Sequence, residues 1–281
     1  MAPRALARPR LESEVTAMLE IRSINKTFNA GTVNAKHALK DLSLTLNDGD
    51  FVTVIGGNGA GKSTMLNAIA GVFPVDSGEI LIDGMDVTHL PEYKRAQYIG
   101  RVFQDPMMGT AATMQIEENM ALAARRGKPR TLRAGITKGE RAGYKEALAE
   151  LGLGLEDRMT SKVGLLSGGQ RQALTLLMAT LQRPKLLLLD EHTAALDPKT
   201  AQKVLEAPDR IVSQTKLTTV MITHNMRDAI AYGNRLIMMY DGRIVVDVSG
   251  EEKKNLTVEQ LLNLFSKASG SDEVSDKLVL S

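Results

Sequence analysis

The residues from Gly56 to Thr64, GGNGAGKST, carry the clearest chemical signal in the chain. They contain the pattern G-x-x-x-x-G-K-S between an apolar β-branched run, FVTVIG, and a segment with helical periodicity. Glycines let successive backbone N–H groups approach phosphate oxygens, and the start of the next helix adds positive partial charge. We therefore predict a phosphate-binding loop in which Lys62 neutralises the β- and γ-phosphates and the Ser63 hydroxyl ligates magnesium. The nucleotide contacts are expected from Gly56, Gly57, Asn58, Gly59, Ala60, Gly61, Lys62, Ser63 and Thr64.

Two carboxylates end the segment KLLLLDE, which runs from Lys185 to Glu191. Its apolar part is typical of a buried strand, and ligands of open α/β sheets collect at the carboxyl ends of such strands. We expect Asp190 to hold magnesium through water. Side chains alternate along a strand, so Glu191 should point differently and act as general base for an attacking water. An isolated Asp-Glu pair can also cap a turn, but the upstream phosphate loop favours the catalytic interpretation.

Two adjacent glycines, Gly168 and Gly169, open a segment that otherwise has helical periodicity, LLSGGQRQAL. Each glycine in a helix costs about 1 kcal/mol relative to alanine. The local sequence gives no reason for this cost, so something must approach that backbone closely.

The elements that position these residues alternate between strands and helices. This alternation predicts a mostly parallel sheet covered on both faces, interrupted by a helical block between roughly 110 and 175. Strand patterns cover 18–28, 37–46, 51–55, 77–87, 98–105, 185–190, 218–223, 234–242 and 243–248, and helical patterns cover 62–70, 116–126 and 138–151.

Composition sets limits on the class of protein. The chain has 281 residues, of which 43% are hydrophobic, and a formal charge of +2. That near-neutral charge and the absence of tryptophan argue against specific nucleic-acid binding. Cysteine is absent, which excludes disulfides and thiolate metal sites and fits a reducing compartment. No stretch approaches about 18 consecutive apolar residues, so we do not expect the chain to cross a membrane by itself.

Both ends of the chain are expected to lie outside the main domain, residues 18–250. The opening residues, MAPRALARPR, are rich in arginine, alanine and proline. We interpret residues 1–17 as a disordered extension, although a transit peptide has a similar composition. Residues 251–281 are expected to form one short helix, TVEQLLNLFSKA, and a polar tail.

These motifs together resemble the ATP-binding cassette ATPases, the nucleotide-binding subunits of ABC transporters. GGNGAGKST resembles their Walker A motif, LLLLDE their Walker B motif, and LSGGQ their signature. The resemblance covers about residues 18–250 and implies a RecA-like P-loop core with an antiparallel β subdomain and an inserted α-helical subdomain. It also implies roles for Phe28 stacking on adenine, Gln104 of the Q-loop, Asp197 of the D-loop and the switch histidine His224.

In this family two cassettes dimerise head to tail, which implies a reason for the paired glycines. The signature of one subunit, Ser167, Gly168, Gly169 and Gln170, would cover the γ-phosphate of ATP bound to the other. Gln104 would ligate magnesium or water, and His224 would contact the γ-phosphate. A lone subunit is then expected to bind ATP but to hydrolyse it poorly. Phe28 could equally be a core residue, since a phenylalanine in a strand is usually buried.

The resemblance implies an ATPase that powers import of a small solute, and we expect an amino-acid-like one. The expected partners are a second, identical subunit, a membrane permease at the cytoplasmic face and a solute-binding protein. An alternative is a non-transport cassette acting on ribosomes, DNA ends or iron–sulfur assembly, and a third is a kinase-like phosphotransferase, which leaves LSGGQ unexplained. The chain departs from the family pattern at His192, where most members have proline, and at Pro208, which should kink a helix.

Overall fold

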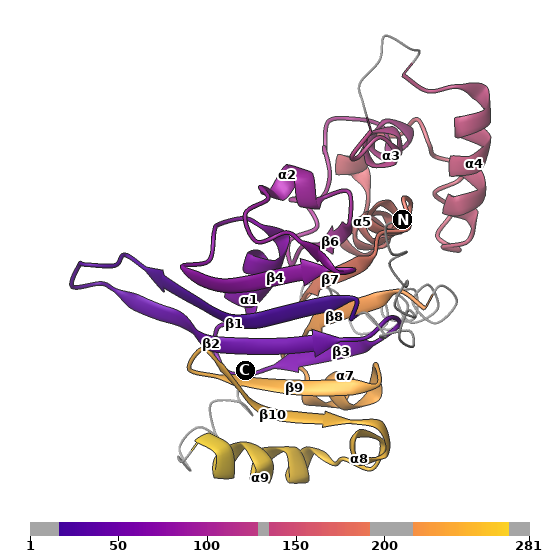
Figure 1. Cartoon of the computed structure of the whole chain (residues 1–281). Coiled ribbons are helices and arrows are strands. Elements are labelled where there is room, and N and C mark those ends of the chain that lie inside the picture. The colour runs from indigo at the N-terminus through magenta and orange to yellow at the C-terminus, as the bar shows by residue number, and fades with distance from the viewer. Residues whose placement is uncertain (1–16, 129–134, 192–215, 270–281) are drawn as a thin grey trace, which may run out of the picture.

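The computed structural model describes residues 17–128, 135–191 and 216–269 (Figure 1). Several predictions lie outside these residues. They are the N-terminal extension up to residue 16, the D-loop residue Asp197, the family departure at His192 and the kink at Pro208.

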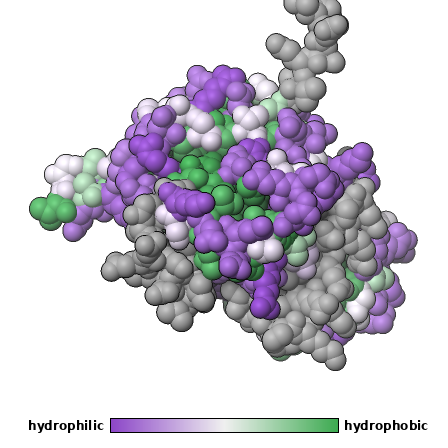
Figure 2. All heavy atoms as spheres, turned by 90° about the horizontal axis from the view of Figure 1, so that it is seen from below, coloured by the Kyte–Doolittle hydropathy of each residue, from purple (hydrophilic) through white to green (hydrophobic). Residues whose placement is uncertain are grey.

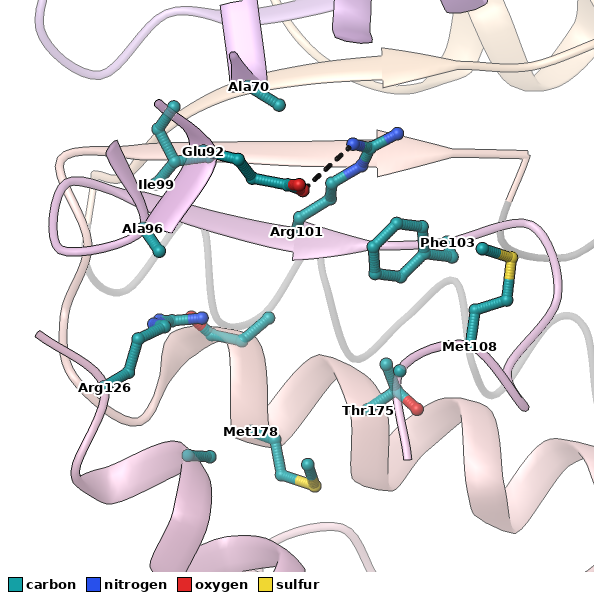
Figure 3. Close-up of a pocket in the computed structure, with 13 residues that line it drawn as sticks. Ala70, Glu92, Ala96, Ile99, Arg101, Phe103, Met108, Arg126, Thr175 and Met178 are labelled. Atoms are coloured by element: carbon teal, nitrogen blue, oxygen red, sulfur yellow. Dashed lines mark hydrogen bonds and ion pairs between the residues drawn. The ribbon is translucent and has the colours of Figure 1, made fainter. Parts of the chain in front are cut away.

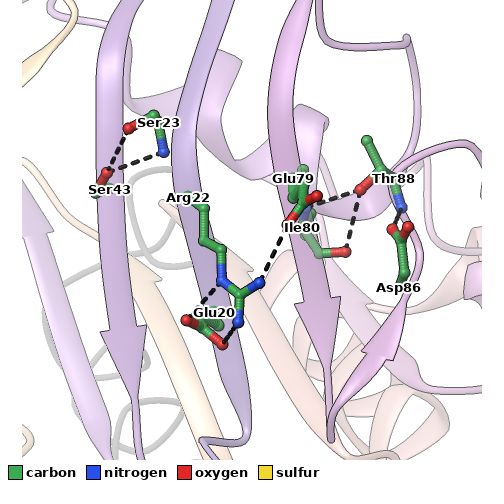
Figure 4. Close-up of polar contacts among 8 residues, drawn as sticks. All are labelled: Glu20, Arg22, Ser23, Ser43, Glu79, Ile80, Asp86 and Thr88. Carbon is green, nitrogen blue, oxygen red and sulfur yellow. Dashed lines mark hydrogen bonds and ion pairs between the residues drawn. The ribbon is translucent and has the colours of Figure 1, made fainter.

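The smaller of two sheets is antiparallel throughout, with the strand order β2-β1-β4-β5. Leu19 and Ile21 on its inner face are buried in the core. On its outer face Arg22 donates to Glu20 at 2.7 Å and to Glu79 at 3.1 Å (Figure 4). The smaller sheet thus has one apolar face and one polar face, as is typical of half-buried antiparallel strands. The strands are β1 (Leu19–Phe28), β2 (Lys36–Leu46), β4 (Ser77–Ile82) and β5 (Met85–Asp86).

The larger sheet has the strand order β10-β9-β3-β8-β7-β6, and its described pairings are parallel except for β9 with β10. Every residue of its central strands β3 and β8 is buried, because helices and the smaller sheet cover both faces. The predicted fold class, an α/β P-loop core with an added antiparallel sheet, is confirmed. The strands are β3 (Phe51–Ile55), β6 (Ile99–Val102), β7 (Leu186–Asp190), β8 (Thr218–Ile222), β9 (Arg235–Tyr240) and β10 (Arg243–Ser249).

Helix α1 (Lys62–Ala70) joins the two sheets, because Met65, Leu66 and Ile69 belong to a core that includes residues from both. The C-terminal helices pack on β9 and β10 through Leu261 and Phe265. Figure 2 views the molecule from this side and shows apolar residues in the middle of a polar border. The remaining helices of this part are α2 (Glu92–Arg95), α7 (Met226–Ala231), α8 (Gly250–Lys254) and α9 (Val258–Ser269).

A group of helices at one end of the molecule has its own core, which contains Met120, Tyr144, Leu148 and Leu174 (Figure 1). In the last turns of α5, Leu177 stays in this core, while Leu176 and Ala179 pack on β6 and β7. Helix α5 therefore connects the helical group to the larger sheet. The group consists of α3 (Ile116–Ala124), α4 (Lys138–Ala149), the short 3-10 helix η1 (Val163–Leu165) and α5 (Gly168–Thr180). Over the described part of the chain, no helix combines the length and apolarity that a bilayer span needs.

Candidate nucleotide-binding site

The phosphate loop connects β3 to α1 and packs tightly against neighbouring backbone. Gly56 has φ 150°, and a Cβ there would lie 2.3 Å from the carbonyl oxygen of Met239 in β9. Gly61 has φ 104°, and a Cβ there would lie 2.8 Å from the carbonyl oxygen of Ala38 in β2. Only glycine fits both the conformation and the space at these two positions. Gly57 differs, because a Cβ there would meet nothing within 4 Å.

Lys62 is the first residue of α1, and its side chain is buried beneath the loop. Its Nζ donates to the carbonyl oxygens of Gly56 at 2.7 Å and Gly57 at 3.2 Å. Burial lowers the pKa of Lys62, while the carboxylates of Glu191 and Asp190 act in the opposite direction. An ammonium has three N–H donors, so one remains for a phosphate oxygen.

A cavity of about 390 Å³ opens over the phosphate loop. It brings together segments that are far apart in the sequence, including β1, the Q-loop and the ends of β7 and β8. The predicted residues that line it are Phe28, Asn58, Gly59, Ala60, Gly61, Lys62, Ser63, Thr64, Gln104, Glu191 and His224. The lining does not include Gly56, Gly57 or Asp190. Gly56 instead supports the loop from behind, against the Met239 carbonyl.

Glu191 is held on both sides by two of the other predicted catalytic or ligating side chains, Gln104 and His224. Its Oε2 accepts a hydrogen bond from the Gln104 amide at 2.9 Å, and its Oε1 lies 2.5 Å from Nε2 of His224. Its backbone has φ 43°, a left-handed conformation that is uncommon for glutamate, and its N–H donates to the carbonyl oxygen of Ile222 at 3.1 Å. Such strain persists only where the surroundings fix it, and it collects at functional sites.

Asp190 ends β7 immediately before Glu191. Burial is the main cause that raises its pKa, and the charge of Glu191 adds to it, while Arg101, Lys62 and His224 oppose the rise. A divalent cation would relieve the repulsion between two adjacent carboxylates. Ser63 and Gln104, whose side chains carry oxygen atoms, line the cavity over the phosphate loop, and Asp190 directly precedes Glu191, which also lines it. This oxygen donor set fits magnesium, which usually takes one or two protein carboxylates together with substrate phosphates.

Phe28 forms part of the cavity wall and is half-buried. Its ring contacts that of Phe73 edge to face, with 5.1 Å between the centroids. Lys26 places its Nζ 5.7 Å from the centre of the Phe28 ring. The ring therefore lines the cavity and packs against a neighbouring ring, and its stacking on adenine stays a prediction.

The signature residues lie at the start of α5, outside this cavity. Ser167 caps the helix: its Oγ accepts from the Gln170 N–H at 3.2 Å, and the Gln170 side chain accepts from the Ser167 N–H at 3.2 Å. Ser167 and Gly168 are exposed, whereas Gly169 is buried. In one chain the structure therefore does not bring the signature to the phosphate loop.

Two cavity residues, Lys36 and Ala38, were not predicted from the sequence. Lys36 pairs with Phe28 across the β1–β2 hairpin. The alternating pattern of β2 was visible in the sequence, but the register that brings Lys36 beside the cavity was not.

A second cavity, of about 270 Å³, lies between β6 and the helical group (Figure 3). Phe103 and Met108 line it toward one end and Arg126 toward the other, while Thr175 and Met178 face it from α5. Phe103 lines this cavity, and the next residue, Gln104, donates the hydrogen bond to Glu191. The second cavity and the Glu191 contact are therefore connected through adjacent residues.

A phosphate loop between a central strand and its helix, with paired carboxylates on a neighbouring parallel strand, defines a P-loop nucleoside triphosphatase. Comparisons with known proteins narrow this class. A family model described as ABC transporter matches residues 39–194, more than half of the chain. The chain belongs to the ABC transporter family and is one of its ATP-hydrolysing cassettes.

Individual relatives agree with this assignment. A tyrosine transport ATP-binding protein of Clostridioides difficile is 45% identical over 251 residues, which cover 89% of this chain and 100% of the relative. A spermidine/putrescine import ATP-binding protein of Haemophilus influenzae is 33% identical, covering 94% of this chain and 68% of the relative. Among solved structures, the dimeric post-hydrolysis state of the cassette MJ0796 with ADP and Pi matches with 30% identity and a TM-score of 0.71, covering 83% of this chain and 98% of that one.

Proposed function

We propose that this chain binds magnesium–ATP at the phosphate loop, and that two identical chains hydrolyse it to drive import of a small solute through a separate membrane permease. The observation that carries this proposal is the divided site. Gln104, Glu191 and His224 meet the phosphate loop in one cavity, whereas Ser167 and Gly168 present an exposed helix N-terminus elsewhere. A second chain, arranged head to tail, would supply the missing wall.

The residues of the cavity divide the chemistry among them. Lys62 and the loop N–H groups neutralise the phosphates. Glu191 orients an attacking water and accepts its proton, and it must give up part of its contact with Gln104 to do so. His224 fixes the Glu191 carboxylate from the other side and can donate to the γ-phosphate. Ser63, Gln104 and Asp190 would hold magnesium, which supplies charge stabilisation to the phosphates.

The permease is proposed to dock in the second cavity. This cavity offers apolar contact through Phe103 and Met108, and Met108 is 69% exposed. Arg101 and Arg126 add positive charge. Arg101 lies 3.9 Å from Glu92, whereas no acid among the described residues forms an ion pair with Arg126. A permease segment pressed against Phe103 would move Gln104, and with it the contact to Glu191. Such docking would hold the chain peripherally at the cytoplasmic face of the membrane.

The solute is proposed to be amino-acid-like, because a relative named for tyrosine transport is 45% identical over its full length. A solute-binding protein is the expected third component. The test is reconstitution of the chain, in vesicles that contain ATP, with a permease that co-purifies with it. Tyrosine uptake that requires both ATP and an intact Lys62 would support the proposal. ATP turnover that responds to ribosomes or DNA but not to any permease would contradict it.

A further inference from the structure

Lys36 lies in the nucleotide cavity but belongs to none of the motifs described above. It is the first residue of β2 and pairs with Phe28 in the antiparallel register. Its side chain lines the same cavity as the phosphate loop. Its Nζ lies 3.3 Å from the position that a Cβ on Gly59 would occupy, so the ammonium reaches over the loop.

The charge balance of the cavity distinguishes Lys36 from Lys62. The Lys62 ammonium donates to two loop carbonyls and interacts with the carboxylates of Asp190 and Glu191. The side chain of Lys36 makes no hydrogen bond or ion pair within the part of the chain that the structure describes. Its positive charge is therefore the one in this cavity with no counter-charge among the described residues. An ammonium in this situation is available to an anionic ligand.

The position of Lys36 indicates which part of a nucleotide it meets. Phe28 lines the cavity and is the residue proposed to stack on the base, and Gly59 belongs to the loop proposed to hold the phosphates. Glu191 and His224, at the ends of β7 and β8, are the groups expected at the γ-phosphate. A cation between the Phe28 ring and the Gly59 loop would face the part of the nucleotide that lies between the base and the γ-phosphate.

We propose that Lys36 is a further nucleotide-binding residue, whose ammonium pairs with the α- and β-phosphates that ATP and ADP share. This inference rests on the proposed nucleotide site and adds to it a contact that the sequence motifs do not contain. It also assigns a purpose to the β1–β2 hairpin, which would bring a cation to the phosphate loop from the smaller sheet.

Calorimetric titration of the full-length chain with MgATP and with MgADP tests the proposal. Lys36→Met should weaken both affinities by about fivefold, because the pair is partly solvated. Lys36→Gln gives the same test with a polar side chain, and Lys36→Arg should keep the affinities. The wild-type affinities should also fall more steeply with added salt than those of Lys36→Met. The matched control is Lys94→Met, which removes an exposed lysine of α2 outside the cavity.

The outcomes separate this inference from the nucleotide site itself. Unchanged affinities in Lys36→Met and Lys36→Gln, with binding abolished by Lys62→Ala, would overturn the role of Lys36 and leave the site intact. A loss confined to MgATP would also contradict it, since that result places the ammonium at the γ-phosphate. Absence of any binding to the wild-type chain would instead overturn the proposed function.

Discussion

The starts of α1 and α5 are both glycine-containing helix N-termini, yet they are built differently. At α1 the preceding Gly61 provides no side-chain cap, so the first N–H groups stay open toward the cavity. At α5 the side chains of Ser167 and Gln170 cap each other's backbone, and the helix start is exposed. The first N-terminus is enclosed by its own chain, and the second is exposed at the surface. The difference teaches that one chain holds a phosphate loop inside its own cavity and, apart from it, an exposed helix start that we propose closes the cavity of a neighbouring chain.

The largest effect should come from replacing Glu191, the proposed general base of the nucleotide cavity. Glu191→Gln keeps the shape of the side chain but cannot accept a proton, so turnover should fall by at least about 100-fold. ATP affinity should remain, and a dimer should accumulate with ATP in size-exclusion chromatography. Phosphate release gives the rate. Turnover at the wild-type rate would show that Glu191 does not act as the base.

A substitution in the enclosed loop should affect stability as well. In Gly56→Ala the new methyl group would lie 2.3 Å from the Met239 carbonyl oxygen, at a backbone angle that disfavours alanine. We expect a loss of about 2–4 kcal/mol in the free energy of unfolding. Gly57→Ala is the matched control, because its methyl group meets nothing within 4 Å. Equal urea midpoints for the two variants would contradict the packing described for this loop.

Substitutions of Ser167 can distinguish its role as the cap of α5 from its proposed contact with a phosphate. Ser167→Asp keeps an oxygen that caps the helix but places a negative charge where the partner's γ-phosphate is expected. Its stability should stay near that of the wild type, while ATP turnover is lost. Ser167→Ala should lose about 1 kcal/mol of stability through the missing cap. Normal turnover in Ser167→Asp would argue that the start of α5 never meets a phosphate.

A second comparison concerns two buried lysines. Lys62 and Lys253 each donate to two backbone carbonyls, but Asp190 and Glu191 lie near Lys62, whereas burial alone lowers the pKa of Lys253 to about 8. The folded state thus binds this proton more weakly than the unfolded state, whose lysine titrates near 10.5. The resulting cost is fully present below pH 8 and is relieved as the pH rises toward 10.5.

This pH effect is the smallest one expected. Between pH 8 and pH 9 the free energy of unfolding of the wild type should rise by about 1 kcal/mol relative to Lys253→Met. Urea unfolding of both proteins at several pH values measures the difference. A difference that is flat across this range would mean that Lys253 keeps an ordinary pKa.

The sequence predicted the elements that carry the motifs well, because their signals are local. The helix predicted at 62–70 coincides with α1, and the apolar run before Asp190 is β7. Contacts between distant segments were less accessible. Neither periodicity nor motif spacing shows that Gln104 and His224 both contact the Glu191 carboxylate. The three residues follow three different strands, and only the folded sheet brings them together. The same reason hid Lys36, whose place depends on the register of a hairpin with several irregularities.

The dependence of ATP turnover on protein concentration tests most directly whether two chains complete the site. Turnover per chain should rise with concentration and level off where light scattering in the presence of ATP detects dimers. Ser167→Asp should stay inactive over the whole range. Constant turnover per chain, down to dilutions at which the protein is strictly monomeric, would contradict the account, because the phosphate cradle of a single chain would then suffice.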